Sequence, residues 1–498
     1  MASRTACPAG RDVFEYMSEQ GWSDGLPLVP PTPARVKHML TGTARNPAEI
    51  LGHCAPIYGE VTVMKVAINA VMAGCTPQHL RLVLAAVEAM LTDEFNVHGV
   101  HATTMGATPA VIVHGPARQE AGLALEHGAL GSSGTRANTT IGRALKLLLQ
   151  NCGGARLAKT ESTTLGSPSK LSLCLAEAEE AAPRWEPYHV AADGQSAVTL
   201  LAVTGGPCQL VDFKTSTALS LCEQYAALVC PLYSATMPCL NDVLLVVSPE
   251  HYATLVGGGV ASKTKLKAAV WHLANRELGA RIRAPVALAM PGAAGLIVGW
   301  VLLVACWCCE LAGSLLLLLF PGSWMRIVPI FSLAIGKIAP KLSSVDSIHV
   351  VVSGAHAGKF SAVLPGFGIG KAGQHPSAHM SRPVTRIVEP PPPALAAADD
   401  APPPASKDAT LLLPTFDRPI ISPLKATART APLKGRVALL DISKPNGNLL
   451  LDTIEKQLAK YDVTCTRYSK PAFAKPLPRE MAERIAATSD AAIIALAD

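Results

Sequence analysis

The stretch RVALLDI (436–442), followed by LLLDTIEKQLAKY (449–461), decides the fold of the C-terminal part. The first segment is a continuous apolar run, and the second is an amphipathic helix that would bury Leu450, Leu451, Ile454 and Leu458. The alternation continues with a strand, a helix and a strand in DVTCTRY, LPREMAERIAATS and AAIIALA. Apolar strands between amphipathic helices predict a parallel sheet with right-handed crossovers. We expect an incomplete Rossmann-like β-α-β-α-β domain over 435–498.

Ligands of open parallel sheets bind beyond the carboxyl ends of the strands. The loop after the first strand places Asp441, Ser443, Asn446 and Asn448 at that edge. We predict a catalytic role for Asp441, and substrate binding for Ser443 and Asn446. The alternative is a helix cap with an Asn-Gly turn, which SKPNGN forms without any ligand.

The third predicted strand leads to Asp498. A nucleophile directly after this strand would lie at the N-terminus of the next helix, whose dipole stabilises a thiolate. We therefore assign Asp498 a catalytic role beside such a nucleophile. Its alternative role is to cap the following helix.

Composition limits the classes of function. The net charge of +6 is spread over 498 residues without a dense basic block, which argues against a nucleic-acid partner. The 13 cysteines have no regular spacing, which favours a reduced compartment over a disulfide framework. The N-terminus lacks the apolar core of a secretory signal, so we expect a cytoplasmic protein.

Residues 1–290 and 341–388 predict one large, mixed α/β domain. TVMKVAINAVMAG reads as a helix ended by Gly74, and a second helix starts at Thr76 and Pro77. In that second helix Leu80, Val83, Leu84 and Val87 form one apolar stripe. PAVIVHG and NDVLLVVSPEH read as buried strands.

An apolar insert spans 291–340, and its core from Ala293 to Phe320 has a single charge, Glu310. As a helix this core would be about 42 Å long, enough to cross a bilayer. A membrane-spanning helix and a retained intron or mispredicted exon are equally good explanations. Between 389 and 434, prolines and small residues without periodicity predict a semi-extended linker.

The segment FNVHGVHATT offers Asn96, His98 and His101, with His114 on the next strand. We predict that Asn96 and His98 contribute to a substrate-binding polar cluster, with structural hydrogen bonding as the alternative. We expect no metal there, because no cysteine or aspartate stands at ligand spacing.

The segment SSGTRANTT places Arg136 and Asn138 before a helix that we expect near Thr140. Backbone N–H groups and Arg136 would receive an anionic group of a substrate there, and simple capping of the helix is the alternative. No other cofactor motif is present, since GAHAGKFS lacks the spacing of a nucleotide-binding P-loop.

At this point the chain resembles a known family. RVALLDISKPNGNLLLDTIEKQL and AAIIALAD are similar to the C-terminal domain of the UGSC family of (seleno)proteins. DGLPLVPPT, KVAINAVMAGC, FNVHGVHATT, GALGSSGTRANTTIGRAL, SPEHYATL and VVVSGAHAGKFSAVLPG resemble that family's long N-terminal part. The apolar insert and the linker lie outside the resemblance.

In that family the strand-ending aspartate is followed by selenocysteine or cysteine and then Gly-Ser-Cys. The resemblance therefore implies a truncated sequence, in which a selenocysteine codon after Asp498 was read as a stop. It implies a thiol or selenol oxidoreductase that reduces or reductively cleaves a small substrate with a thiol reductant, and that is inactive as truncated.

A second interpretation, in place of the oxidoreductase, is a single-pass membrane protein that is anchored by 293–320 and has a ligand-binding or interaction role. A third interpretation makes the N-terminal domain the enzyme through Arg136, Asn138, Asn96 and His98.

Overall fold

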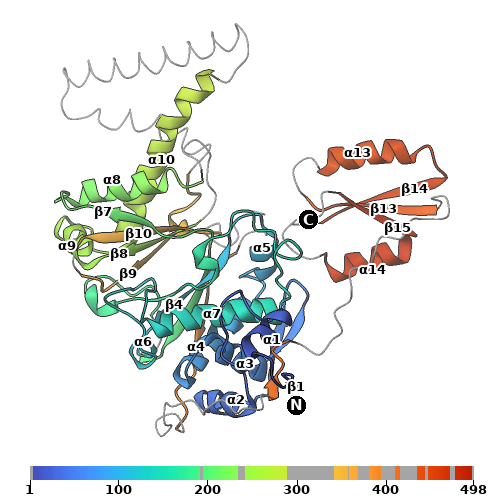
Figure 1. Ribbon diagram of the computed structural model, residues 1–498. Coiled ribbons are helices and arrows are strands. Elements are labelled where there is room, and N and C mark those ends of the chain that lie inside the picture. Colours follow the sequence, from blue (N-terminus) through green and yellow to red (C-terminus); the bar gives the residue numbers. More distant parts are fainter. Residues whose placement is uncertain are drawn as a thin grey trace.

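The computed structural model is an α/β protein, as the sequence predicts. It describes residues 4–190, 194–233, 242–288, 341–356, 358–367, 381–393, 410–415, 435–443, 447–470 and 477–495. A large N-terminal part contains two four-stranded sheets, and a small C-terminal part contains a three-stranded sheet (Figure 1).

The first sheet of the N-terminal part has the order β11-β6-β4-β5. Its central strands β4 (Thr108–His114) and β6 (Ala197–Val203) are antiparallel and fully buried. The outer strands are β5 (Cys174–Ala176), parallel to β4, and β11 (Val384–Ile387), antiparallel to β6. The second sheet has the order β7-β10-β8-β9. Its strands are β7 (Cys208–Val211), β8 (Val243–Val247), β9 (Ile348–Val352) and β10 (Phe360–Pro365).

The two sheets pack face to face between two helical layers. Alternation along each strand sends one set of side chains to the partner sheet, such as Ile112 against Leu244, and the other set to the helices. Helices α4 (Pro77–Met90) and α7 (Arg136–Asn151) cover the first sheet, and α3 (Val63–Ala73) packs against both of them. Helices α8 (Ala218–Val229) and α10 (Lys263–Leu288) cover the second, and α9 (Pro249–Gly257) packs beside α8. The order of layers is therefore helix, sheet, sheet, helix.

Short elements complete the N-terminal part. They are α1 (Val13–Glu19), α2 (Pro33–Met39), α5 (Val97–Ala102), α6 (Ala117–Glu120) and the hairpin of β2 (Ile50–Cys54) with β3 (Gly59–Thr62). Single 3-10 turns occupy Leu40–Gly42, Pro168–Lys170, Glu179–Ala181 and Val345–Ser347.

The boundary between α3 and α4 confirms the predicted helix signals. Gly74 ends α3 with a φ of 92°, a left-handed conformation that glycine adopts without strain. Pro77 is the first residue of α4, and the backbone N–H of Thr76 donates to Nδ1 of His79. The predicted stripe of α4 is buried, but so are Leu82 and Arg81 on its other faces. The helix is buried on nearly every side, with only Gln78 and Glu88 partly exposed, which its sequence period did not indicate.

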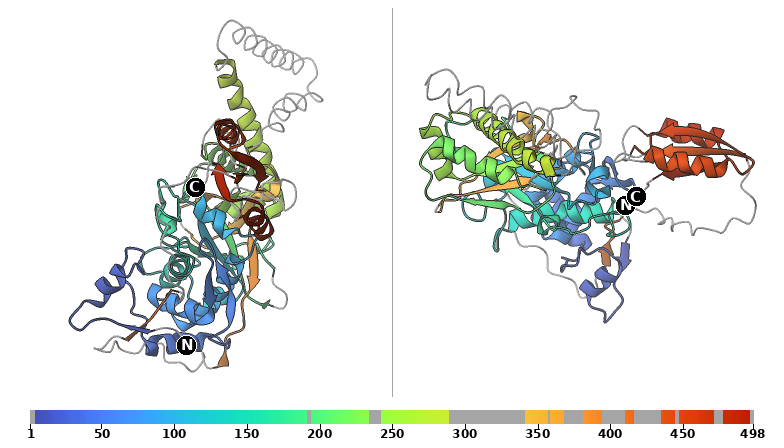
Figure 2. Two further views of the ribbon diagram at one scale, coloured as in Figure 1. Left: turned by 90° about the vertical axis from the view of Figure 1, so that its right-hand side faces the viewer. Right: turned by 90° about the horizontal axis from the view of Figure 1, so that it is seen from above.

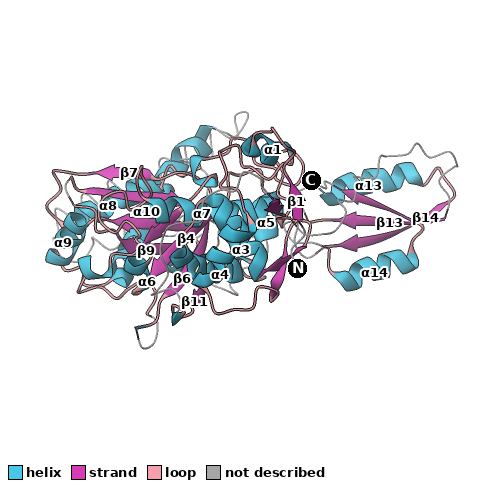
Figure 3. Ribbon diagram, turned by 60° about the horizontal axis from the view of Figure 1, so that its bottom comes forward, coloured by secondary structure: helices cyan, strands magenta, loops and turns pink. Residues whose placement is uncertain are grey.

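The C-terminal sheet has the order β14-β13-β15, and all three strands are parallel. The strands are β13 (Gly435–Asp441), β14 (Val463–Ser469) and β15 (Ala491–Ala495). Helix α13 (Gly447–Leu458) covers one face of the sheet and α14 (Arg479–Thr488) the other (Figures 2 and 3). The predicted β-α-β-α-β order is confirmed. Leu451 and Leu458 are buried as expected, whereas Leu450 is 39% exposed because it faces away from the sheet.

One strand lies inside the predicted linker. β12 (Thr410–Leu412) pairs antiparallel with β1 (Arg4–Ala6) near the other end of the chain. Leu411 is fully buried in the core under the first sheet, and Nδ2 of Asn69 donates to the carbonyl of Pro414. This strand was not predicted, because three residues are too few to show a period.

The apolar segment 293–320 lies outside the described residues. Within the described part of the chain, no helix is both long enough and apolar enough to cross a bilayer.

Candidate functional site

The carboxyl edge of the C-terminal sheet brings two predicted residues together. Asp441 ends β13 between Ser469 of β14 and Ala495 of β15. Its Oδ1 accepts a 2.8 Å hydrogen bond from the backbone N–H of Ser443, which has a left-handed φ of 67°. The Ser443 hydroxyl donates to the carbonyl of Lys470. The two side chains thus build the turn after β13. Asn446 and Asp498 lie outside the described residues.

Lys470 adds a positive charge to this edge. It follows β14 directly, its backbone N–H donates to the carbonyl of Asp441 at 2.7 Å, and the residue is 8% exposed. Burial, and secondarily the ammonium of Lys470, lower the pKa of His98 on α5. The strand ends of the C-terminal sheet are therefore within electrostatic reach of α5, which lies on the side of the N-terminal part toward that sheet (Figure 1).

The predicted cluster around α5 divides into a cap and a ring contact. Asn96 adopts a left-handed conformation with φ 51°, and its Oδ1 caps α5 by accepting from the N–H of Gly99 at 3.3 Å. His98 stacks on Tyr58 with ring centroids 6.5 Å apart. Its Nδ1 is buried without a hydrogen-bond partner among the described residues. Asn96 therefore acts as a structural cap, and His98 is the residue of this pair with an unused polar atom.

His101, one turn further along α5, enters a buried ionic cluster. Its Nδ1 lies 3.7 Å from Oε2 of Glu161, and Oε1 of Glu161 is 2.9 Å from Nζ of Lys170. Desolvation lowers the pKa of His101 to about 4, so its ring is neutral at pH 7. Lys146 of α7 reaches the same cluster, where burial first and the charge of Lys170 second lower its pKa to about 7. Four titratable side chains thus meet between α5, α7 and the loop that follows α7.

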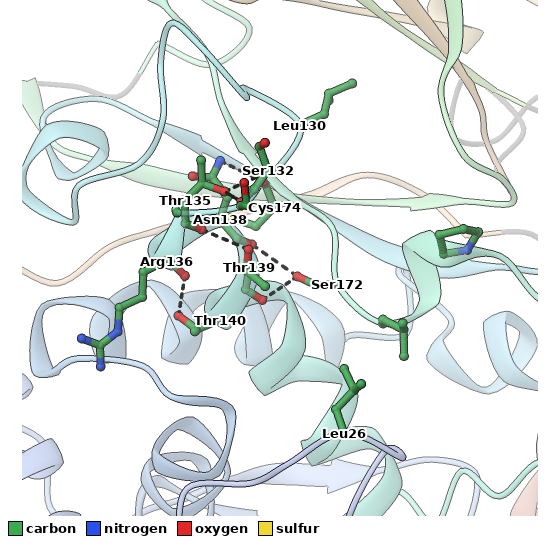
Figure 4. A pocket seen from close by; sticks show the side chains of 15 residues that line it. Leu26, Leu130, Ser132, Thr135, Arg136, Asn138, Thr139, Thr140, Ser172 and Cys174 are labelled. Carbon is green, nitrogen blue, oxygen red and sulfur yellow. Dashed lines mark hydrogen bonds between the residues drawn. The ribbon is translucent and has the colours of Figure 1, made fainter.

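The glycine-rich segment before α7 borders a groove of ≈ 680 Å³ (Figure 4). Helix α7 begins at Arg136, earlier than the predicted start near Thr140, so Arg136 and Asn138 lie in its first turn. The Nε of Arg136 donates to the carbonyl of Gly74 at 3.0 Å, and its side chain extends away from Ser132 (Figure 4). The guanidinium of Arg136, which lines the groove, is thus anchored to the carbonyl of Gly74 at the end of α3.

Asn138 is buried, 1% exposed, and its amide is fully engaged. Its Oδ1 accepts from the N–H of Ala124 at 2.9 Å, and its Nδ2 donates to the carbonyls of Cys174 at 3.1 Å and Ala129 at 3.4 Å. These three bonds tie the loop before α7 to β5. The contacts favour the structural interpretation of Asn138, because little of its hydrogen-bonding capacity is left for a substrate.

A second polar cluster surrounds His114 at the end of β4. One ligand atom from each of His114, Glu177 and Glu179 lies within 4.8 Å of the others, close enough to hold a metal ion. However, Glu177 already pairs with Lys263 and accepts from the N–H of Tyr188 at 2.6 Å. Glu179 likewise accepts from the N–H of Gly115 at 2.8 Å and contacts Arg118 at 3.2 Å. Since both carboxylates already face cations, the donor set is that of a structural ion network.

A family comparison matches the C-terminal part. Residues 410–498 match the model of the UGSC family, from β12 through the last described strand. This region belongs to the UGSC family. The matched segment contains Asp441, Ser443 and Lys470, and all of α13 and α14. No curated protein and no solved structure matches the chain significantly.

Sequence reasoning missed three members of the cluster around His101. Lys146 looks like an ordinary polar position of an amphipathic helix, and Glu161 and Lys170 lie in an irregular segment without a motif. At the carboxyl edge of the C-terminal sheet, sequence reasoning predicted Asp441 and Ser443 but not their neighbour Lys470, which follows a half-exposed strand. In both places the signal is tertiary, because it arises only when separate segments meet.

Proposed function

We propose that the UGSC region is the redox module of a thiol or selenol oxidoreductase that acts on a small substrate. The observation that carries this proposal is the parallel register at the carboxyl edge, which sets Ala495, the last described residue of β15, beside Asp441. The match of residues 410–498 to the UGSC family supports it. By resemblance to that family, we expect a cysteine or selenocysteine after Asp498 and a second cysteine shortly behind. When this pair reduces the substrate by two electrons, a disulfide or selenium–sulfur bond forms between its two members. A thiol reductant then returns the pair to its reduced form.

The residues already in place fit an anionic sulfur or selenium atom. Lys470 is nearly buried at this edge, where its positive charge favours a thiolate over a thiol. The backbone of the turn after β13 is fixed by the carboxylate of Asp441 and the hydroxyl of Ser443. Their role in this proposal is to hold the edge rigid and polar, and Ser443 and Asn446 are the groups offered to a substrate.

The experiment extends the chain after Asp498 with Cys-Gly-Ser-Cys and follows alkylation of the new thiols between pH 5 and 9. The expected result is a first cysteine that reacts with a midpoint well below the pKa of about 8.5 of a free thiol. An extension in which Ser replaces only the first Cys is the matched control. The proposal is overturned if alkylation of the first added cysteine has the midpoint of an ordinary thiol, both in the extended chain and in the extended chain with Lys470→Met.

The redox proposal places the protein in the cytoplasm with a thiol reductant as partner. Four buried cysteines suit a reducing environment, because burial raises the pKa of the thiols of Cys54, Cys75, Cys152 and Cys174 and keeps them unreactive. The competing proposal of a membrane anchor at 293–320 predicts that the natural protein stays with membranes after an alkaline wash. Release of the protein by that wash would remove the anchor and leave the redox proposal standing.

A further inference from the structure

Lys146 presents its amine to the protein interior. Lysine side chains usually bury their carbon chain and keep the ammonium in water. In Lys146 the Nζ atom is the buried end, and no described residue forms a hydrogen bond with it. An unpaired ammonium in such a place is strongly destabilising, whereas a neutral amine costs far less. The geometry therefore favours the uncharged form of this side chain.

Three titratable side chains lie within electrostatic range of Lys146. His101 has a fully buried ring, and neither of its nitrogens has a hydrogen-bond partner within the described ranges. Glu161 is ionised, since the contacts with His101 and Lys170 and the charge of Lys170 outweigh its own desolvation and lower its pKa. Lys170 is held by Glu161 and by the carbonyl of Ala107 at 2.8 Å. The cluster thus combines a carboxylate base, a neutral imidazole and a fixed cation.

Two side chains of this cluster are partly exposed to solvent. The side chain of Glu161 is 14% exposed and that of Lys170 is 12% exposed. Both belong to the irregular segment between α7 and β5. The cluster therefore meets the surface at Glu161 and Lys170, and a molecule of a few atoms would have to enter there.

We propose that Lys146 is a nucleophilic amine that forms an imine with a small aldehyde or α-keto acid. The neutral amine attacks the carbonyl carbon, a proton passes from nitrogen to oxygen, and loss of one water leaves the C=N bond. The two hydrogens of the neutral amine leave with the carbonyl oxygen as that water, and the negative charge of Glu161 lies near enough to stabilise the cationic intermediates. The fixed cation of Lys170 faces a carboxylate on the ligand. No electrons are transferred, so the reaction needs no oxidant or reductant.

The electrostatics agree with this role. With its pKa lowered to about 7, Lys146 is roughly half neutral at pH 7, against roughly one part in a thousand for an ordinary lysine. Desolvation and a neighbouring cation are the two means by which proteins activate lysine amines. The site is independent of the redox edge of the UGSC region, so either proposal can fail without the other.

The experiment treats the native full chain with glyoxylate and sodium cyanoborohydride, which reduces an imine to a stable secondary amine. Peptide mass spectrometry then measures the rate of modification of each lysine between pH 5.5 and 9. Exposed Lys159, in the same segment of the chain, is the internal control. We expect Lys146 to react at least about tenfold faster than Lys159 at pH 7, with a midpoint near pH 7.

Two variants separate a reactive amine from a buried structural lysine. Lys170→Met removes a like charge that lowers the pKa of Lys146, so the midpoint should move to higher pH. Glu161→Gln removes the charge that raises this pKa, so the midpoint should move to lower pH. A thermal melt of each variant confirms that it is folded. The proposal is overturned if Lys146 reacts no faster than Lys159 in the native wild-type chain, or reacts only after denaturation.

Discussion

The Nδ1 atom of His101 lies 3.7 Å from Oε2 of Glu161, although the two residues belong to different segments on either side of β4 and α7. The imidazole is fully buried, and the carboxylate keeps its negative charge through Lys170. A neutral histidine beside an ionised glutamate makes this cluster sensitive to acid. The consequence is a dependence of stability on pH that one substitution can isolate.

We predict that His101 makes the protein less stable as the pH falls from about 7 to 4. The pKa of His101 is lowered to about 4 in the folded state, against about 6.5 when unfolded. Between these values the unfolded chain binds a proton that the folded chain does not, so stability rises with pH. The expected loss is on the order of 2–3 kcal/mol. Melting temperatures of wild type and His101→Gln across this range should converge at low pH, and parallel curves would contradict the prediction.

Removing the amide of Asn138 should destabilise the N-terminal part. Asn138→Ala leaves the N–H of Ala124 and the carbonyl of Cys174 without their side-chain partner in a buried place. The expected cost is about 2–4 kcal/mol in the free energy of unfolding, measured by urea denaturation. Asn138→Asp keeps the acceptor for the N–H of Ala124 but loses the donor to the two carbonyls. If the three bonds act separately, its free energy of unfolding should lie between those of the wild type and Asn138→Ala.

Gly42 should not tolerate a methyl group. A Cβ atom there would lie 2.0 Å from the carbonyl oxygen of Pro77, which is backbone and cannot swing aside. Gly42→Ala should therefore cost about 1–3 kcal/mol, because it pushes the turn after α2 away from α4. Gly206→Ala is the matched control, since a Cβ there meets nothing within 4 Å. Equal melting temperatures for the two variants would show that this contact is looser than the structure indicates.

Ser443 should tolerate glycine better than alanine. Both replacements lose the hydroxyl bond to the carbonyl of Lys470, but only alanine remains strained at a φ of 67°. Ser443→Gly should be more stable than Ser443→Ala by about 1 kcal/mol. Denaturation of the C-terminal sheet, followed through the fluorescence of Tyr461 or Tyr468, measures the difference. The reverse order of the two variants would mean that the turn relaxes to another conformation.

The sequence predicted best where a long periodic signal exists. The C-terminal sheet follows from its strands and helices, because continuous apolar strands with amphipathic crossovers admit few other arrangements. The end of α3 and the start of α4 were equally readable from Gly74 and Pro77. The face-to-face packing of the two N-terminal sheets was not predictable, since it depends on which face of each buried strand meets a helix.

The candidate site was predicted only in part. Asp441 and Ser443 lie at the expected strand edge because topology fixes that position. Lys146 and Lys170 were invisible to sequence reasoning, since nothing local marks a lysine whose amine points inward. Asn138 was chosen for its place near a helix start, but its three partners come from distant segments.

The pairing of β1 with β12 has a consequence for biosynthesis. Residues 4–6 meet residues 410–412, so about 400 residues must leave the ribosome before this pair can form. At typical elongation rates that interval is about 20–80 s. During this time the apolar surface that Leu411 finally covers stays open, and nascent chains are exposed to chaperones and proteases there.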